Sequence, residues 1–422
     1  MCCSNAPLTE SPPSEFLADP PLTVPDFRFV QALSIAVVGG SLGGLTAARL
    51  LSDAGHDVTV YERSSSELEE RGAGIGFLHA TARYLVERAG IDVSEISVET
   101  PYIRYLHRNG SIASEQAHSY LFSSWNTVYR KLLDGFEAKR YLLGHELVDF
   151  DQDGDGVTAH FANGVSRRCD LLICADGIGS TGRAKLQPQA KPAYAGYLAW
   201  RGMVPENQLP AEVASRLSDA ITYYVYANSH ILIYPIPNVA GSVKPGERLL
   251  NFVWYRNYLE GDDLDDVLTD HNGVQHQLSV PPGAMAPHHV AEARAVAAAR
   301  LPAVAAAVVQ ATEDLFVQTI YDIEVEAMAF GRACLLGDAA FAVRPHAAAG
   351  TAKAADDGWA LVAALDEAET IEEALANWES SQRVLGRTLL ERTRDVGARS
   401  QVSSTWEPGD PNVIFGLHRP GD

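Results

Sequence analysis

The chain has few cysteines, no segment rich in lysine and arginine, and no long apolar run. Its five cysteines are an odd number without metal-ligand spacing, which argues against a disulfide framework and favours a reducing compartment, the cytoplasm. The formal net charge of −21, with no basic block, argues against nucleic acid and anionic membrane surfaces as partners. Because no apolar segment is long enough to span a bilayer, no membrane partner is expected either.

What is present fits an ordinary globular protein. Hydrophobic residues make up 46% and charged residues 21% of the 422 positions, enough for a large core shared by two closely joined parts. The first 33 residues are rich in serine, proline and acids and lack the basic and apolar regions of a secretion signal. We expect a disordered extension there, with Cys2 and Cys3 in its tip.

A strand–turn–helix–strand unit begins at Ser34 and ends on Glu62, with a glycine-rich turn at 39–44. The glycines let backbone N–H groups and the helix N-terminus meet a pyrophosphate, and Glu62 can accept hydrogen bonds from a ribose. Ordinary βαβ units close with similar turns, and Ser41 replaces the usual middle glycine. The predicted dinucleotide contacts are Gly39, Ser41, Leu42, Gly43, Gly44 and Glu62, with Arg63 as a phosphate contact or a solvated side chain.

Two later strands also end in an acid beside a glycine, at Asp176-Gly177 and at Gly337-Asp338. Ligand contacts in a doubly wound sheet lie at this edge, although ordinary turns use Asp-Gly as well. The small residues of 345–350 then let backbone approach a flat ring. An acid for a hydroxylated chain followed by bare backbone suits the ribityl chain and ring of a flavin. The residues predicted to contact FAD here are Asp176, Gly177, Asp338, Pro345, Ala348 and Gly350, together with Gly74 from a separate glycine-rich turn.

From Tyr194 the chain turns to long aromatic strands, which predict an antiparallel sheet able to wall an aromatic-sized pocket. The alanine-rich run from Ala291 to Ala311 is expected to form one helix, and more helices follow Gly350. The predicted fold is α/β, a Rossmann-like FAD-binding domain with an inserted antiparallel β-sheet substrate domain and C-terminal helices. The expected division is 1–33 (disordered extension), 34–190 and 319–365 (FAD-binding domain), 191–318 (substrate domain) and 366–422 (C-terminal helical segment).

Two motifs that could hold a metal are better explained without one. The run 151–156 resembles the start of an EF-hand loop, but Ala162 stands where a bidentate glutamate is needed. Its flanks alternate like strands, so a hairpin turn is predicted instead of a calcium site. The pair His288-His289 lacks further ligand spacing and is interpreted as a surface pair. No metal is expected.

The three acid–glycine elements, in this order, resemble the group A flavoprotein aromatic hydroxylases. The resemblance covers Ser34 to about Leu417, and Trp125 departs from it where many members carry arginine. It implies tightly, non-covalently bound FAD, NADH or NADPH as co-substrate, and O2 activated as a flavin C4a-hydroperoxide that hydroxylates a small aromatic substrate. Likeness to the 2,6-dihydroxypyridine 3-monooxygenase subgroup implies a hydroxypyridine, as in nicotinate or nicotine catabolism. That likeness is carried by the segments 194–197, 200–202, 234–237, 344–350 and 407–409.

His230 and Tyr234 are the predicted catalytic pair. They lie four residues apart on a strand-like run, which places both side chains on one face. By resemblance to 6-hydroxynicotinate 3-monooxygenases, His230 is expected to act as base or orienting partner and Tyr234 to donate a hydrogen bond to the ring substituent. The alternative is a histidine and a tyrosine of the sheet core.

Two other functions stay open at this point. The chain could be a decarboxylating hydroxylase of the salicylate or 6-hydroxynicotinate type, for which CO2 release is the discriminating product. It could also be a non-catalytic binding protein on an FAD fold, like the prenyl-GTPase chaperones, against which the intact Asp176-Gly177 and Gly337-Asp338 motifs argue. A homodimer is considered as well.

Overall fold

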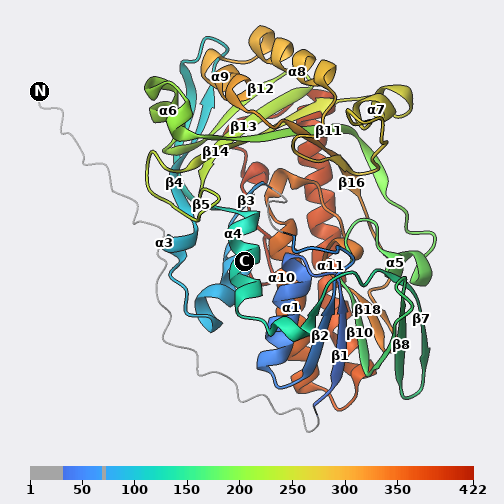
Figure 1. The fold of residues 1–422 in the computed structure, drawn as a ribbon. Helices are drawn as coiled ribbons and strands as arrows, with labels where there is room; N and C mark the ends of the chain where they lie inside the picture. Colours follow the sequence, from blue (N-terminus) through green and yellow to red (C-terminus); the bar gives the residue numbers. More distant parts are fainter. Residues whose placement is uncertain (1–31, 69–72) are drawn as a thin grey trace, which may run out of the picture.

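The computed structural model describes residues 32–68 and 73–422, so the predicted extension at 1–33 lies almost entirely outside the described residues. A six-stranded sheet in the order β17-β18-β10-β1-β2-β6 forms one part of the molecule (Figure 1). Its strands pair in parallel except for β17 at the edge. They are β1 (Ser34–Val38), β2 (Asp57–Tyr61), β6 (Tyr141–Leu142), β10 (Leu171–Cys174), β17 (Ala329–Phe330) and β18 (Ala333–Leu335).

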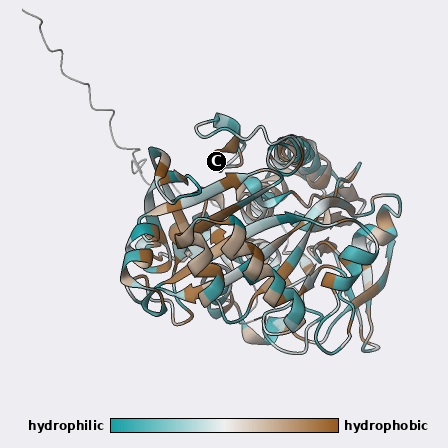
Figure 2. Ribbon diagram, turned by 90° about the horizontal axis from the view of Figure 1, so that it is seen from above, coloured by the Kyte–Doolittle hydropathy of each residue, from teal (hydrophilic) through white to brown (hydrophobic). Residues whose placement is uncertain are grey.

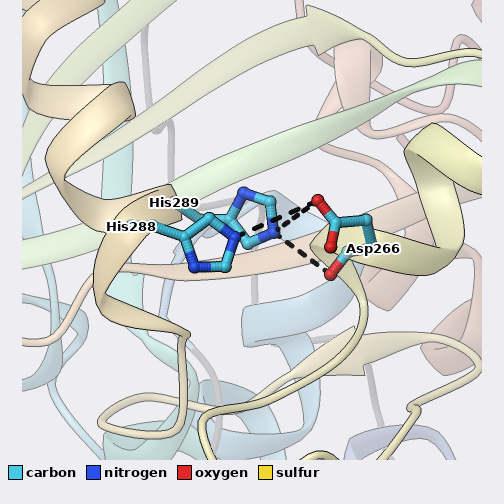
Figure 3. A group of neighbouring side chains, drawn as sticks. All are labelled: Asp266, His288 and His289. Atoms are coloured by element: carbon cyan, nitrogen blue, oxygen red, sulfur yellow. Dashed lines mark hydrogen bonds and ion pairs between the residues drawn. The ribbon is translucent and has the colours of Figure 1, made fainter.

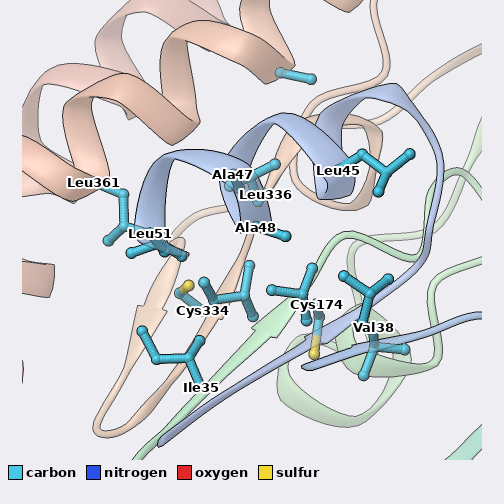
Figure 4. Close-up of a cluster of buried hydrophobic side chains, with 14 of the residues drawn as sticks. Ile35, Val38, Leu45, Ala47, Ala48, Leu51, Cys174, Cys334, Leu336 and Leu361 are labelled. Atoms are coloured by element: carbon cyan, nitrogen blue, oxygen red, sulfur yellow. The ribbon is translucent and has the colours of Figure 1, made fainter. Parts of the chain in front are cut away.

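The parallel strands are apolar on both faces because both faces are covered. Helix α1 (Leu42–Asp53) lies against the sheet, and Ala47 and Leu51 pack over Ile35, Cys174 and Cys334 (Figure 4). Helix α10 (Gly350–Glu367) packs on α1. A three-stranded sheet of β7 (Leu147–Asp153), β8 (Gly156–Phe161) and β9 (Ser166–Cys169) contacts β10 and β1. The turn between β7 and β8 confirms the predicted hairpin.

The second part is a nine-stranded sheet in the order β15-β16-β11-β14-β13-β12-β4-β5-β3. Helices cover one of its faces, and seen from above they mix apolar and polar residues, as amphipathic helices do (Figure 2). The opposite face looks toward the first part. The strands are β3 (Gly74–Gly76), β4 (Val98–Leu106), β5 (Ile112–Ser124), β11 (Ala193–Pro205), β12 (Ala220–Tyr226), β13 (Ser229–Ile236), β14 (Leu249–Asn257), β15 (Ser279–Val280) and β16 (Phe316–Asp322). The covering helices are α6 (Ala211–Leu217), α7 (Asp262–Val267), α8 (Pro287–Arg300) and α9 (Ala303–Ala311).

Three details differ from the sequence prediction. Strands β3, β4 and β5 belong to the second sheet, although the expected division placed 34–190 in the FAD-binding domain, and β16 crosses the expected boundary at 318. The sheet is mixed, because β4 and β12 pair in parallel. The alanine-rich run forms two helices instead of one, since Pro302 cannot supply the backbone N–H that a continuous helix needs.

Helix α11 (Ile371–Ala398) connects the two parts at the C-terminal end of the chain (Figure 1). Trp378 packs in the core of the six-stranded sheet, whereas Val396 packs with the aromatic side chains of the nine-stranded sheet. The cleft between the sheets is therefore backed by one continuous helix. Within residues 32–68 and 73–422, no helix is both long and apolar enough to cross a membrane.

Candidate active site

The glycine-rich turn after β1 forms an anion-binding corner. Gly39 has φ +102°, and a Cβ on Gly44 would lie 1.9 Å from the Gly39 carbonyl oxygen, so both positions require glycine. Ser41 makes no side-chain hydrogen bond to α1, which leaves the first N–H groups of the helix available. The Glu62 carboxylate accepts hydrogen bonds from Gly40 N at 2.8 Å and Ser64 N at 2.9 Å. This geometry suits a pyrophosphate at the helix and a ribose beside Glu62.

The Asp176-Gly177 turn is held from inside the protein. The Asp176 carboxylate accepts hydrogen bonds from Ser180 Oγ and Gly182 N at the start of α5 (Thr181–Leu186), and burial raises its pKa above the usual value. The buried Arg183 donates to the carbonyl oxygens of Ile178 and Ala339. Arg183 thus fixes this turn to the Gly337-Asp338 turn, although the sequence analysis gave it no role.

Asp338 lacks the partners that Asp176 has. No described residue donates a hydrogen bond to its carboxylate, and burial raises its pKa to about 6, with attraction to Lys353 opposing the rise. The neighbouring Gly337 has φ +63° and donates its N–H to Asp357 Oδ2 at 2.9 Å. A partly buried carboxylate that faces a cavity and has no donors is suited to the hydroxyl groups of a ligand, which fits the ribityl chain expected from the sequence.

Two adjoining cavities, each of about 340 Å³, unite these elements. Ser41, Trp125, Gly177 and Asp338 line both, so the cavities meet along one continuous wall. Every residue predicted to contact FAD lines at least one of them. The first cavity is lined by Leu42, Gly43, Gly44, Gly74, Pro345, Ala348 and Gly350, and the second by Gly39, Glu62, Arg63 and Asp176.

Trp125, which stands where an arginine was expected, lies at the junction of the two cavities. Its ring stacks on Tyr129 at 4.9 Å between centroids. Trp125 therefore presents a flat, uncharged ring at this junction, where an arginine would present a positive charge.

The first cavity continues to the nine-stranded sheet and has an aromatic wall there. Phe122 stacks on Tyr234 at 4.1 Å between ring centroids, and Tyr255 and Phe415 complete the wall. On the other side β3 approaches the 345–350 segment so closely that a Cβ on Gly76 would lie 2.6 Å from Ala348 Cβ. A small aromatic ring fits such a space beside the FAD cleft.

The polar groups of this aromatic wall are few. Tyr234 Oη donates to Gly74 O at 2.9 Å, and Arg201 Nη2 donates to the same oxygen at 3.0 Å. Arg201 Nη1 donates to Gln318 Oε1 at 2.9 Å. No hydrogen bond to a described residue is made by Tyr255 Oη. Burial raises the pKa of Tyr234 to about 12 and raises that of Tyr255 as well, so both phenols stay protonated at neutral pH.

His230 and Tyr234 share a face of β13, as predicted, but only Tyr234 is among the residues that line the cavity. His230 lies behind Tyr255, with ring centroids 4.6 Å apart, and is covered by Trp406 at 4.9 Å. Its Nδ1 lies 3.2 Å from Gln401 Nε2, and burial lowers its pKa to about 3. His230 therefore lies behind Tyr255 and does not reach a ring in the cavity.

Arg201, Gln318 and Tyr255 are cavity residues that the sequence analysis did not single out. For Arg201, the alternation of β11 could have indicated this position, because Tyr197, Ala199 and Arg201 fall on one face of that strand. No such signal existed for Gln318 or Tyr255, whose places depend on how β16 and β14 pair with β11.

A separate group of polar side chains lies on the helices that cover the nine-stranded sheet and lines neither cavity (Figure 3). His289 Nε2 lies 3.1 Å from the Asp266 carbonyl oxygen and 3.4 Å from Asp266 Oδ2, and His288 Nε2 lies 4.0 Å from Oδ2. A proton on His289 Nε2 makes its contact with the Asp266 carbonyl oxygen a hydrogen bond between α7 and α8. Because His289 is only 8% exposed, the expected surface pair holds for His288 alone.

Comparison with known proteins agrees with this geometry. Residues 37–66 match the family model of the NAD(P)-binding Rossmann-like domain, and residues 194–322 match that of the FAD binding domain-like family. The 2,6-dihydroxypyridine 3-monooxygenase of Paenarthrobacter nicotinovorans is 35% identical over 388 residues, which cover 91% of this chain and 95% of that protein. This chain belongs to the FAD-dependent aromatic-ring monooxygenases of group A.

Other relatives of this monooxygenase support the assignment. The 6-hydroxynicotinate 3-monooxygenase of Pseudomonas fluorescens is 27% identical over 404 residues, covering 92% of this chain and 95% of that protein. The solved structure of 2,6-dihydroxypyridine-3-hydroxylase from Arthrobacter nicotinovorans has a TM-score of 0.87 and 34% identity, covering 92% of this chain and 99% of that one. The predicted fold and the FAD cofactor are thereby confirmed. This monooxygenase is an enzyme that uses FAD to hydroxylate an aromatic ring.

Proposed function

We propose that the substrate is a hydroxypyridine, oxidised with NADH or NADPH and O2. The observation that carries the proposal is the aromatic-walled cavity, which opens onto the FAD cleft and shares Asp338 and Gly177 with it. In the overall reaction one oxygen atom enters the ring and the other leaves as water, while the nicotinamide supplies two electrons. The relatives named above act on hydroxylated pyridine rings, which supports this ring class.

When bound, FAD supplies the electron transfer and the activation of O2. The chain binds it through the α1 N-terminus, Glu62 and Asp338. Phe122, Tyr234 and Tyr255 hold the ring flat and exclude water from the cavity. Because the single proton of Tyr234 Oη goes to Gly74 O, Tyr234 offers an acceptor lone pair to a ring hydroxyl. Toward a substrate it is therefore an acceptor, where the sequence analysis expected a donor.

The test of this proposal is NADH or NADPH oxidation by the FAD-loaded enzyme with a panel of rings. We expect dihydroxypyridines to accelerate oxidation of the nicotinamide with little peroxide release. Release of CO2 from a 6-hydroxynicotinate-type ring would instead support the decarboxylating alternative. In that case Arg201, a cation in the cavity, could pair with the carboxylate of the ring. If no hydroxylated ring accelerates the oxidation, the proposed substrate class is wrong.

Replacing Tyr234 with phenylalanine removes the acceptor for the ring hydroxyl and one hydrogen bond to Gly74 O. We expect kcat/KM to fall about tenfold or more while FAD content stays at the wild-type level. The matched control is Tyr224→Phe, because Tyr224 packs with the helix-covered face of the nine-stranded sheet. Equal losses in both variants, or none in Tyr234→Phe, would contradict the role of Tyr234.

We also propose that the enzyme works in a reducing compartment, the cytoplasm. Cys169, Cys174 and Cys334 are buried and unpaired, and burial raises the pKa of each thiol above its usual value. We also propose that the enzyme forms a homodimer, which sedimentation of the FAD-loaded enzyme tests.

A further inference from the structure

Arg201 lines the first cavity and has no carboxylate partner there, whereas several other partly buried arginines of this fold are paired with acids. Arg104 pairs with Glu115 and Asp219, Arg248 pairs with Glu206, and Arg344 pairs with Asp322. Across residues 32–68 and 73–422, no ion pair joins Arg201 to an acid. Its guanidinium donates only to the neutral oxygens of Gln318 and Gly74, and its buried Nε has no acceptor.

The surroundings of Arg201 make this unpaired charge significant. Among the described residues that line the first cavity, Arg201 and Asp338 are the charged ones, and no ion pair joins them. The other side chains near Arg201 are neutral: Gln318, Tyr234, Tyr255 and apolar residues, none of which offers a countercharge for a cation. A cation held in such a place is stabilised by an anion that arrives from outside.

The position of the guanidinium is fixed before any ligand binds. Gln318 Oε1 and Gly74 O hold two of its nitrogens, so a ligand oxygen meets a preorganised donor and little side-chain entropy is lost on binding. Tyr255 Oη, which makes no hydrogen bond to a described residue, adds a neutral donor in the same wall. Neither tyrosine can act as the base that removes a proton from a ligand hydroxyl, because burial keeps both phenols protonated by raising their pKa values.

We propose that Arg201 selects ring substrates bearing an anionic oxygen and holds that oxygen in the cavity. The inference rests on the proposed function, since it assigns the charge state of the ring that the enzyme hydroxylates. The anionic oxygen is either a ring oxyanion, formed when a ring hydroxyl releases its proton to solvent, or a ring carboxylate. In both cases the negative charge makes the ring more electron-rich than its neutral form.

Equilibrium binding to the oxidised, FAD-loaded enzyme tests the proposal without turnover. Difference absorbance measures the dissociation constant and the protonation state of the bound ring, below the pH at which the free hydroxyl ionises. Three probes are used: a dihydroxypyridine, its dimethoxy analogue, which cannot form an oxyanion, and 6-hydroxynicotinate. We expect wild-type enzyme to bind the dihydroxypyridine with the spectrum of its anion and to bind the dimethoxy analogue weakly.

The variant Arg201→Gln keeps hydrogen-bonding groups but removes the charge. We expect it to bind the dihydroxypyridine about 10- to 100-fold more weakly and without the anion spectrum. Arg201→Lys, which retains the charge, is expected to lose less. The control is Arg256→Gln, because Arg256 on β14 pairs with Glu292 and lines neither cavity. FAD content and melting temperature of each variant show whether it is folded.

The outcomes separate this inference from the proposed function. A loss confined to 6-hydroxynicotinate would identify the carboxylate as the anionic oxygen, and a loss with the dihydroxypyridine would identify the oxyanion. If Arg201→Gln binds both rings as wild type does, with the same spectra, the inference is overturned while ring hydroxylation stands. If wild-type enzyme neither binds nor hydroxylates any of these rings, the proposed substrate class itself fails.

Discussion

The variant Asp338→Asn is expected to lose tight FAD binding and, at the same time, to be more stable than wild type when free of FAD. The Asp338 carboxylate is partly buried and has no hydrogen-bond donors, and desolvation raises its pKa in the folded protein to about 6 from an ordinary 3.8. The folded state therefore binds this proton more tightly than the unfolded state. Its contribution to stability is fully present below pH 3.8 and is lost as the pH rises through 6.

Asparagine cannot ionise, so the stability of the FAD-free variant relative to FAD-free wild type should increase as the pH rises from 3.8 to about 6. The raised pKa corresponds to about 3 kcal/mol at most in the FAD-free protein above pH 6. The measurement is the free energy of unfolding of both FAD-free proteins at pH 4 and pH 7.5, together with FAD affinity at pH 7.5. Equal stabilities at the higher pH, or wild-type FAD affinity in the variant, would contradict the role of Asp338.

Replacing Lys353 with methionine is expected to cause the largest loss of stability. Lys353 Nζ lies 2.7 Å from Asp357 Oδ2, and their side chains are 1% and 0% exposed. Removing one partner of a fully buried ion pair leaves the other charge unpaired, which costs about 3–5 kcal/mol. Because Asp357 also accepts the Gly337 N–H, FAD affinity should fall with stability. Urea unfolding of the FAD-free protein measures the first effect.

Two further variants make the Lys353 prediction specific. Adding Asp357→Asn to Lys353→Met removes the stranded charge and keeps an acceptor for Gly337 N, so part of the lost stability should return. The control Lys139→Met breaks the exposed pair with Glu137, in which the side chains are 77% and 58% exposed, and should cost less than about 1 kcal/mol. A Lys353→Met loss no greater than the control would contradict the account.

The FAD cleft could be predicted from the sequence because its elements are local. Gly39–Gly44, Asp176-Gly177 and Gly337-Asp338 each combine a strand end, a turn and a polar group within a few residues, and all three line the adjoining cavities. Their order along the chain then indicates a shared sheet edge. The division into parts failed where strand pairing is long-range, since nothing local shows that β3–β5 join the second sheet.

The substrate cavity could be predicted only in part. The four-residue spacing correctly placed His230 and Tyr234 on one face, but Trp406 covers His230, and the sequence gives no measure of that distant contact. Arg201 stands in a strand like any other arginine. What makes it a candidate is that it lines the cavity without an ion pair to any described acid, a property of the folded chain alone.

We propose that this enzyme transfers one atom of O2 to a hydroxypyridine. The most direct measurement is mass spectrometry of the product formed from 2,6-dihydroxypyridine by the FAD-loaded enzyme with NADH or NADPH under oxygen-18 gas. We expect a ring product that carries one labelled oxygen and forms in proportion to the nicotinamide oxidised. A product without label, or oxidation of the nicotinamide with peroxide as the sole oxygen product, would contradict it.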